Sequence, residues 1–365
     1  MSVLVEERPT ITALAVHREV QDALPHLSPE AEAGLGLVHA SPVRLEVPGL
    51  EMHDMYIFDL TGYASGSFKL NGNAWAVQQY IYGRDGDPNV HRFYSGTAGN
   101  AGAALAAAAQ ARGRQAVLYA PSTLREPKRA NMERFGGEVR VVSSPLVTTA
   151  IEHAMQAAND DPNGRFVHPF DDQHVVTGQG LIGKHIVRTL KADSVSKPVK
   201  QFVQVGGGSL LTSLASNGYN EGWKTYAVRP ARMKDGELDV RYDGLAVTTQ
   251  GSRGAAMLKD PSFVHGLEEV TPGDTGRAAI EALKTFRRIY EPSALVGVAA
   301  LLRHAKGNPE PTTYVGVLSG RNAEASALSE FVDAAYEGPD AEPLYTVGVG
   351  RGTVVACGAT ALFSR

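Results

Sequence analysis

The chain has 365 residues, of which 43% are hydrophobic and 20% charged, a composition typical of a folded globular protein. Its 35 basic and 39 acidic side chains give a net charge of −4, and it has no basic tract that could neutralise the phosphates of a nucleic acid. The single cysteine, Cys357, excludes an intrachain disulfide framework and a clustered-thiolate metal site. We therefore expect a cytoplasmic protein without a nucleic-acid partner.

Membrane and export signals are not evident in the sequence. The first residues, MSVLVEER, reach charged side chains before an apolar signal-peptide core could form. No uninterrupted apolar run approaches the about 20 residues of a membrane span. We expect no membrane partner.

Helix-forming and strand-forming segments alternate along the chain, with glycines between them. In the first half, a glycine-rich turn at 95–102 precedes a predicted helix (103–112), a strand (115–120), a helix (126–135) and a strand (138–142). The second half predicts strands at 166–168, 200–205, 225–228 and 313–318, and helices at 175–190, 210–215, 275–288 and 293–304. This alternation predicts an α/β fold with parallel sheets covered by helices.

The second glycine-rich turn, Gly206-Gly207-Gly208-Ser209, lies between a predicted strand and a predicted helix. Main-chain N–H groups at such a helix start converge on an anion, so phosphate binding is one interpretation and a tight connection the other. A nicotinamide fingerprint fits poorly, because the third glycine of its pattern would fall at Leu211. A P-loop is excluded, since no Gly-Lys-Ser/Thr follows the turn.

Lys69 stands between Phe68 and Leu70 at the predicted start of a helix. Most lysines are solvated surface charges. Partial burial between two apolar neighbours would lower the pKa of this lysine and make its neutral amine available as a nucleophile or base.

Several segments together carry a family resemblance. Residues 66–72, with the sequence GSFKLNG, are similar to the Schiff-base lysine motif of fold-type II pyridoxal phosphate enzymes, the group of threonine dehydratases, serine racemases, threonine synthases and cysteine synthases. Further segments resemble the family in its order: TAGN at 97–100, HPFDD at 168–172, GQGLIG at 178–183, VGGGSL at 205–210, EPS at 291–293 and LSGRN at 318–322. The resemblance spans about residues 41–322 and is strongest to threonine dehydratases.

The resemblance implies a fold like that of the tryptophan synthase β subunit, with two parallel-sheet lobes and pyridoxal 5′-phosphate in the cleft between them. The smaller lobe (89–167) would be inserted in a larger one (1–88 and 168–365). Lys69 would be the catalytic residue, and a homodimer is implied. The residues implied to bind the cofactor are Phe68, Lys69, Asn100, Gly206, Gly207, Gly208, Ser209 and Ser319. Those implied to bind the amino-acid substrate are Ser67, Thr97, Ala98, Gly99, Asn100 and Ala101.

The implied reaction is β-elimination from a serine- or threonine-like amino acid, giving a 2-oxo acid and ammonia. A serine beside the pyridine nitrogen leaves the ring neutral, which favours loss of a β-substituent over transamination. A β-replacement synthase, in which a second nucleophile adds to the aminoacrylate, is the alternative. A catalytically silent cofactor- or nucleotide-binding protein is a third hypothesis.

Some residues depart from the family pattern. Ala98 replaces the serine that racemases use as a second acid/base, so racemisation by that route is not expected. Ala101, Asn71 and Asn73 leave the substrate side chain undefined. Basic residues at 229, 232 and 234 would repel a cation, so we expect no metal site. Arg253 and Arg321 could reach a substrate anion, although a solvated surface position is the commoner role of arginine.

Overall fold

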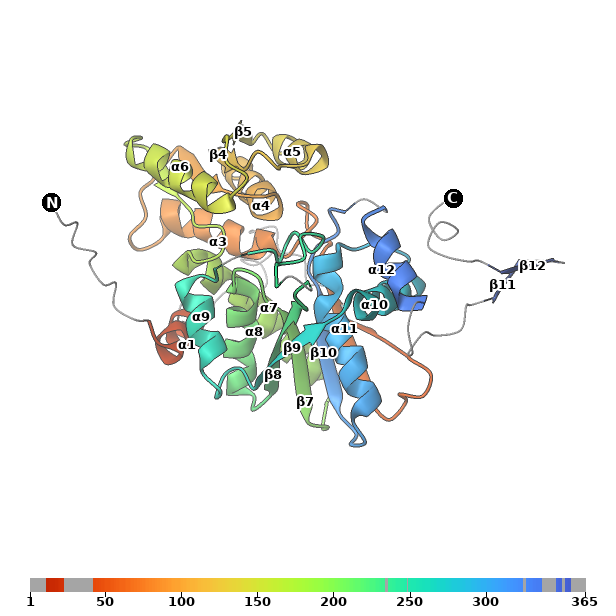
Figure 1. Ribbon diagram of the computed structural model, residues 1–365. Coiled ribbons are helices and arrows are strands. Elements are labelled where there is room, and N and C mark those ends of the chain that lie inside the picture. The colour runs from red at the N-terminus through yellow and green to blue at the C-terminus, as the bar shows by residue number, and fades with distance from the viewer. Residues whose placement is uncertain are drawn as a thin grey trace.

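The computed structural model describes residues 11–22, 42–233, 236–247, 249–323, 326–336, 346–349 and 352–355. Two β-sheets, each flanked by helices, account for most of the described residues, and the smaller sheet lies above the larger one in Figure 1. β11 (Thr346–Val349) and β12 (Gly352–Val355) form a separate antiparallel pair.

The larger sheet has the strand order β1-β2-β10-β7-β8-β9. Its strands are β1 (Pro42–Arg44), β2 (Asp54–Asp59), β7 (Val199–Gln204), β8 (Lys224–Pro230), β9 (Gly266–Val270) and β10 (Thr313–Leu318). β1 pairs antiparallel with β2, and the other neighbours pair parallel. Successive side chains of a strand point to opposite faces: Tyr56 and Phe58 join one hydrophobic core, whereas Met55 and Ile57 join another. The sheet is therefore buried on both faces.

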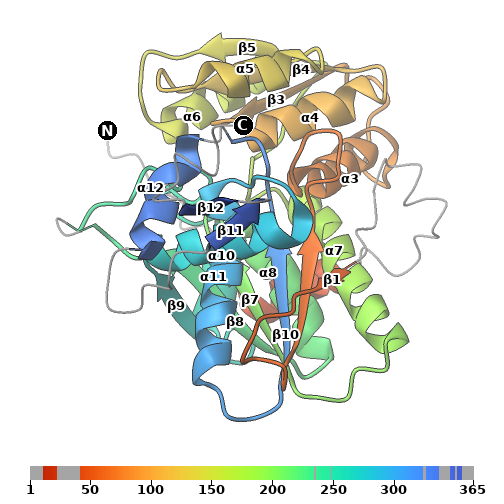
Figure 2. The same ribbon diagram turned by 90° about the vertical axis from the view of Figure 1, so that its right-hand side faces the viewer.

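Helices cover both faces of the larger sheet (Figure 2). One face packs against α7 (Gln173–Ala192) and α8 (Ser209–Asn220), which in turn contact α1 (Ala13–Asp22); α9 (Ser252–Lys259) contacts α8 and α1. The other face packs against α11 (Pro292–Gly307), which contacts α10 (Pro272–Phe286) and α12 (Ser326–Tyr336). No helix among the described residues combines the length and apolarity that a membrane crossing needs.

The smaller sheet has the order β5-β4-β3-β6, with all pairs parallel. Its strands are β3 (Arg92–Gly96), β4 (Gln115–Ala120), β5 (Glu138–Val141) and β6 (Gly164–Phe166). α4 (Asn100–Gln110) packs on β3 and β4, next to α5 (Glu126–Glu133), and α6 (Val147–Asn159) packs on β3, β4 and β6. α3 (Lys69–Tyr82) contacts both α4 and α7, and so joins the small sheet's layer to the large one.

The predicted α/β class with two parallel sheets is confirmed, and the bounds of its elements differ by a few residues. β10 has the predicted bounds. The strand predicted at 166–168 was placed too late, because β6 pairs with β3 from Gly164 onward. The helix predicted at 103–112 begins at Asn100, so the glycine-rich turn before it is shorter than expected.

Candidate functional site

A pocket of about 80 Å³ lies where β7 and β10 end and α3 and α8 begin. The carboxyl ends of parallel strands meet at this edge of the sheet, which is where α/β folds bind ligands. All eight residues predicted to hold the cofactor line the pocket: Phe68, Lys69, Asn100, Gly206, Gly207, Gly208, Ser209 and Ser319. The structure thus brings together residues that are up to 251 positions apart, from 68 to 319.

Lys69 is the first residue of α3, as predicted. Its Nζ lies 3.4 Å from the main-chain oxygen of Pro169 and 4.9 Å from the centre of the Phe68 ring. Burial lowers the pKa of Lys69 to about 8, because the low-dielectric surroundings disfavour the charged ammonium. A neutral amine is the form that attacks an aldehyde or accepts a proton.

The predicted phosphate loop is a backbone cradle that admits only small residues. Gly208 has a left-handed backbone (φ +98°), and a Cβ on it would lie 2.5 Å from the Cα of Gly254. A Cβ on Gly207 would collide with the Phe170 ring. Since α8 starts at Ser209, its unpaired N–H groups and positive dipole end face this cradle. The loop therefore fits a phosphate group.

The segment before Lys69 is held at the end of β10. Ser67 forms a bridge to Gly320, and Phe68 N donates to the Ser319 oxygen over 3.0 Å. Ser67 Oγ is buried and has no hydrogen-bond partner within the described part of the chain. These contacts place Lys69 beside the end of the strand that leads to Ser319.

The predicted substrate loop follows β3 directly. Thr97 is buried, and its Oγ1 accepts hydrogen bonds from Gly99 N and Gly102 N, each over 3.0 Å. Ala98 is exposed and Ala101 is partly exposed. Gly99 has φ +149°, and a Cβ there would lie 2.7 Å from Lys128 Cδ. The loop is therefore fixed by its own hydrogen bonds before any substrate arrives.

Glu291 is a site residue to which the sequence assigned no role. It lines the pocket and is 2% exposed. Asn100 Nδ2 donates to both of its carboxylate oxygens over 2.9 and 3.0 Å, and Asn322 N donates to Oε1 over 3.0 Å. Burial raises the pKa of Glu291, and Asp243 raises it further, while Lys128 opposes the shift. The sequence signal that could have identified Glu291 was the EPS motif at 291–293, which resembles the family.

A second contact between the two layers joins Lys128 of α5 to Asp243, which precedes the pocket residues Gly244 and Leu245. The two side chains are 12% and 29% exposed. Together with Asn100 and Glu291, this ion pair closes the small layer onto the large one.

Other predicted residues have structural roles. Asp171 and Asp172 precede the predicted helix 175–190, and such carboxylates are expected to cap it. Asp172 does so by accepting from His174 N and Val175 N. For Asp171 this expectation is wrong, because it accepts from Ser252 N and Arg253 N at the start of α9. Arg321 is exposed.

The segment expected to lack a metal site is ordered by ion pairs and main-chain bonds. Arg229 pairs with Glu269 over 2.6 Å, and Arg232 Nη1 donates to the Gly236 oxygen. Lys234 and Asp235 lie outside the described residues. Across the residues that are described, no three histidine, cysteine, aspartate or glutamate side chains gather as metal ligands would.

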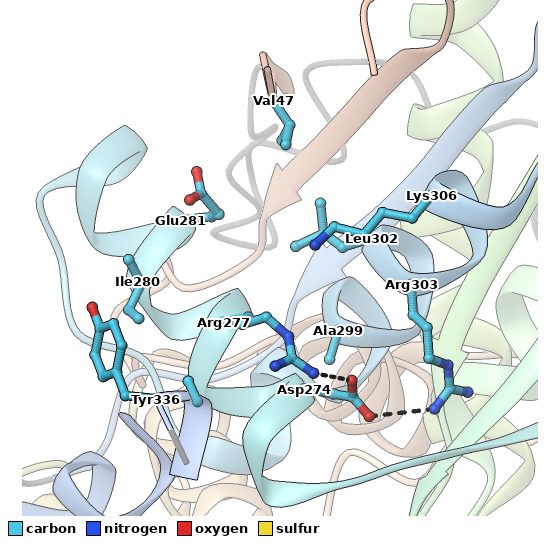
Figure 3. A pocket seen from close by; sticks show the side chains of 11 residues that line it. Val47, Asp274, Arg277, Ile280, Glu281, Ala299, Leu302, Arg303, Lys306 and Tyr336 are labelled. Carbon is cyan, nitrogen blue, oxygen red and sulfur yellow. Dashed lines mark hydrogen bonds and ion pairs between the residues drawn. The ribbon is translucent and has the colours of Figure 1, made fainter. Parts of the chain in front are cut away.

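A larger hollow of about 350 Å³ lies between α10 and α11 (Figure 3). Its charges already serve the fold: Asp274 pairs with Arg277 over 2.8 Å and with Arg303 over 3.3 Å, and completes a capping box with Thr271. The pocket around Lys69, although smaller, is the one with a glycine cradle and a buried amine.

Comparison with known proteins decides the family. The family model described as "Pyridoxal-phosphate dependent enzyme" matches residues 54–320. The chain belongs to this family of pyridoxal-phosphate dependent enzymes. Its membership confirms the predicted resemblance and the predicted cofactor, and residues 68–319 of the pocket lie within the matched range.

Two relatives and one solved structure show how close the family likeness is. The chain is 26% identical over 294 residues to a biosynthetic L-threonine dehydratase of Lactococcus lactis, covering 74% of this chain and 68% of that one. It is 29% identical over 264 residues to a threonine dehydratase of Nicotiana attenuata, covering 68% of this chain and 42% of that one. A threonine deaminase isoform 2 from Solanum lycopersicum superposes with a TM-score of 0.75 at 21% identity, covering 92% and 93% of the two chains. This likeness confirms the fold-type II architecture.

Proposed function

We propose that this pyridoxal-phosphate dependent enzyme removes the β-substituent of a serine- or threonine-like amino acid and releases a 2-oxo acid and ammonia. One observation carries the proposal: the Lys69 amine, with its pKa lowered to about 8, shares a pocket with the glycine cradle and Ser319. The names of the two dehydratase relatives support the same reaction class.

The cofactor-binding roles follow from the geometry of the pocket. When bound, pyridoxal phosphate draws electron density away from the Cα of an attached amino acid. The N–H groups of the 206–209 turn would hold its phosphate. Ser319, 8% exposed at the end of β10, would offer its ring nitrogen a neutral partner, and Lys69 would hold its aldehyde carbon covalently. Phe68 lies beside that amine.

Lys69 also carries the proton step. The substrate carboxylate would rest on the main-chain N–H groups of the 97–101 loop, with Ser67 close to the lysine, which directs the Cα–H bond toward Nζ. The amino group of the substrate would displace Nζ from the aldehyde carbon, and the freed Nζ would take the Cα proton as general base. The electron pair left on Cα would expel the β-substituent, and for serine or threonine the departing hydroxyl would take a proton from the Nζ ammonium and leave as water. Addition of water to the released product would then give the 2-oxo acid and ammonia.

Glu291 and Asn100 would orient this chemistry. The family resemblance implies that Asn100 binds the cofactor, and its amide already donates to Glu291 while its Oδ1 accepts from Asn322 Nδ2 over 2.8 Å. We propose that the Glu291 carboxylate fixes the Asn100 amide at the cofactor's edge. The burial that raises the pKa of Glu291 also gives the pair a strong local field.

The wider organisation is proposed on the same basis. We propose a small domain of 89–167 inserted between 1–88 and 168–365; all four strands of the smaller sheet fall between Arg92 and Phe166, which supports it. We propose a homodimer from the family resemblance. A cytoplasmic location without nucleic-acid or membrane partners is proposed from the charge balance, the single cysteine and the lack of a long apolar run. Sedimentation of the holoenzyme tests the dimer.

The test is turnover without any added nucleophile. The holoenzyme is incubated with serine, threonine and their β-substituted analogues, and 2-oxo acid and ammonia are measured together. We expect the two products in equal amounts. Product that forms only when a second nucleophile is supplied would replace elimination with β-replacement. Cofactor binding without turnover of any amino acid would favour a catalytically silent protein.

A further inference from the structure

Arg253 lies in the first turn of α9 and connects two distant parts of the chain. Its side chain is 16% exposed, so it is not a solvated surface arginine. Its Nε donates to Glu19 Oε2 of α1 over 2.8 Å, and its Nη1 donates to the main-chain oxygen of Asp171 over 2.9 Å. The planar guanidinium thus spans α1 and the segment before α7 in a fixed geometry.

The side chain of Asp171 in turn binds the first residues of α9. Its Oδ2 accepts from the backbone N and the Oγ of Ser252, each over 2.8 Å, and its Oδ1 accepts from Arg253 N over 3.0 Å. Asp171 therefore caps α9 while Arg253 of α9 holds the backbone of Asp171. Such reciprocal charge-assisted bonds leave neither segment free to shift alone.

Both segments touch the cofactor site. Gly251 N, one residue before α9, donates to the oxygen of Gly207 over 3.0 Å. Gly254 packs directly against Gly208 of the phosphate loop. On the other side, Pro169 holds the Lys69 amine through its main-chain oxygen. The Arg253 network thus contacts the phosphate loop and the lysine segment at once.

We propose that Arg253 is a positioning residue for pyridoxal phosphate, and that Glu19 acts through it, so that the contact from Glu19 of α1 to Arg253, rather than the docking of α1 as a whole, contributes to cofactor affinity. Arg253 is not among the residues that line the pocket. It fixes the 207–209 backbone and the 169–171 backbone relative to each other, and the N–H groups of a phosphate cradle bind well only when several point at the same place. The inference rests on the family's cofactor and is independent of the reaction catalysed.

The experiment measures the dissociation constant of pyridoxal phosphate by absorbance titration of the apoprotein. Glu19→Gln keeps the shape of the side chain and removes its charge, and we expect the dissociation constant to rise about threefold to tenfold. The matched control is Ser216→Ala. It removes the bonds that His17 and Gln21 of α1 make to Ser216 Oγ, over 2.8 and 3.2 Å, without touching Arg253. We expect it to stay within about twofold of the parent protein.

The relative losses of cofactor affinity in these variants test whether Glu19 acts through Arg253. Arg253→Met should weaken binding more than Glu19→Gln, and the double variant should be no worse than Arg253→Met alone, because Glu19 acts through Arg253. A Glu19→Gln protein with unchanged cofactor affinity, or a Ser216→Ala protein with the same loss, would overturn the proposal. Should Arg253→Met fail to fold, the Glu19 and Ser216 variants still decide. Because turnover is not measured, a wrong substrate assignment leaves this result unaffected.

Discussion

The two sides of the pocket differ in the groups that form them, which are main-chain atoms on one side and side chains on the other. On the phosphate side, main-chain atoms of Gly207 and Gly208 form the surface, and neighbouring backbone and the Phe170 ring leave no room for a Cβ. On the substrate side, side-chain contacts join the two layers: Asn100 donates to Glu291, and Lys128 pairs with Asp243. The first side belongs wholly to the larger layer, whereas the second joins both layers.

This difference indicates that the two sides serve affinity and turnover separately. A backbone cradle is already organised before the ligand arrives and costs little to use. Side-chain contacts between the layers act on how the small layer meets the large one, and so on how the substrate loop is held. We expect changes on the phosphate side to alter cofactor affinity, and changes on the substrate side to alter KM and kcat.

The largest effect is expected for Lys69→Ala, at the junction of the two sides. Loss of the amine removes both the covalent attachment and the general base, so kcat should fall by about 10³-fold or more. Borohydride treatment followed by mass measurement should show the cofactor fixed to the parent protein and not to the variant. Lys191→Ala is the control, because that lysine is 65% exposed and pairs with Glu221. Turnover within tenfold of the parent would disprove the assignment.

The phosphate side is tested by Gly207→Ala. The new methyl group would collide with Phe170, and overpacking of this kind costs about 1–3 kcal/mol. If the loop shifts to relieve it, cofactor affinity should fall about tenfold to 100-fold, with little change in kcat at saturating cofactor. Gly307→Ala, where a Cβ meets open space, controls for the added methyl group. A large loss of kcat with unchanged affinity would contradict the division between the two sides.

How much of the fold and of the site can be predicted from the sequence depends on how far apart in the chain the contacting residues lie. β10 was predicted to its exact ends because six consecutive buried residues form a run that only a central strand accommodates. The start of α3 at Lys69 was also predicted. In contrast, β2, α1 and α6 were not predicted. The apolar core of β2 is short, whereas α1 and α6 bury residues at helical spacing, such as Ala150, Ala154 and Ala158 in α6, and that spacing was an available signal.

Side-chain partners far apart in the chain were the least predictable. Asp171 lies next to a predicted helix, so capping that helix was the natural expectation, but its partners Ser252 and Arg253 follow about 80 residues later. Glu291 carried no predicted role because Asn100 lies 191 positions away. Residue type limits what a carboxylate can do, and only the fold determines which donors reach it.

The lowered pKa of Lys69 predicts a pH dependence for the rate of covalent cofactor attachment, and this effect is of intermediate size. Its amine is protonated and unreactive below its pKa of about 8 and neutral above it. The rate at which apoprotein attaches pyridoxal phosphate covalently should therefore rise about tenfold per pH unit up to pH 8 and then level off. An ordinary lysine would keep gaining rate toward pH 10.5. Stopped-flow absorbance gives the rate, and N-acetyl-lysine methyl ester under the same conditions corrects for titration of the cofactor. A rise that continues beyond pH 9 would contradict the burial of this amine.

The smallest effect is expected on the substrate side, from the ion pair between the layers. Lys128→Met and Asp243→Asn each remove it, and partly exposed ion pairs are worth about 0.2–1 kcal/mol, so KM for the amino acid should rise about fivefold or less. Cofactor affinity should not change. If the pair only holds the layers together, the two variants will have equal effects and the double variant will be no worse than either one. The methylene groups of Lys128 run over Gly99 of the substrate loop. A larger loss for Lys128→Met would therefore mean that the lysine also contributes its charge to substrate binding, in addition to joining the two layers.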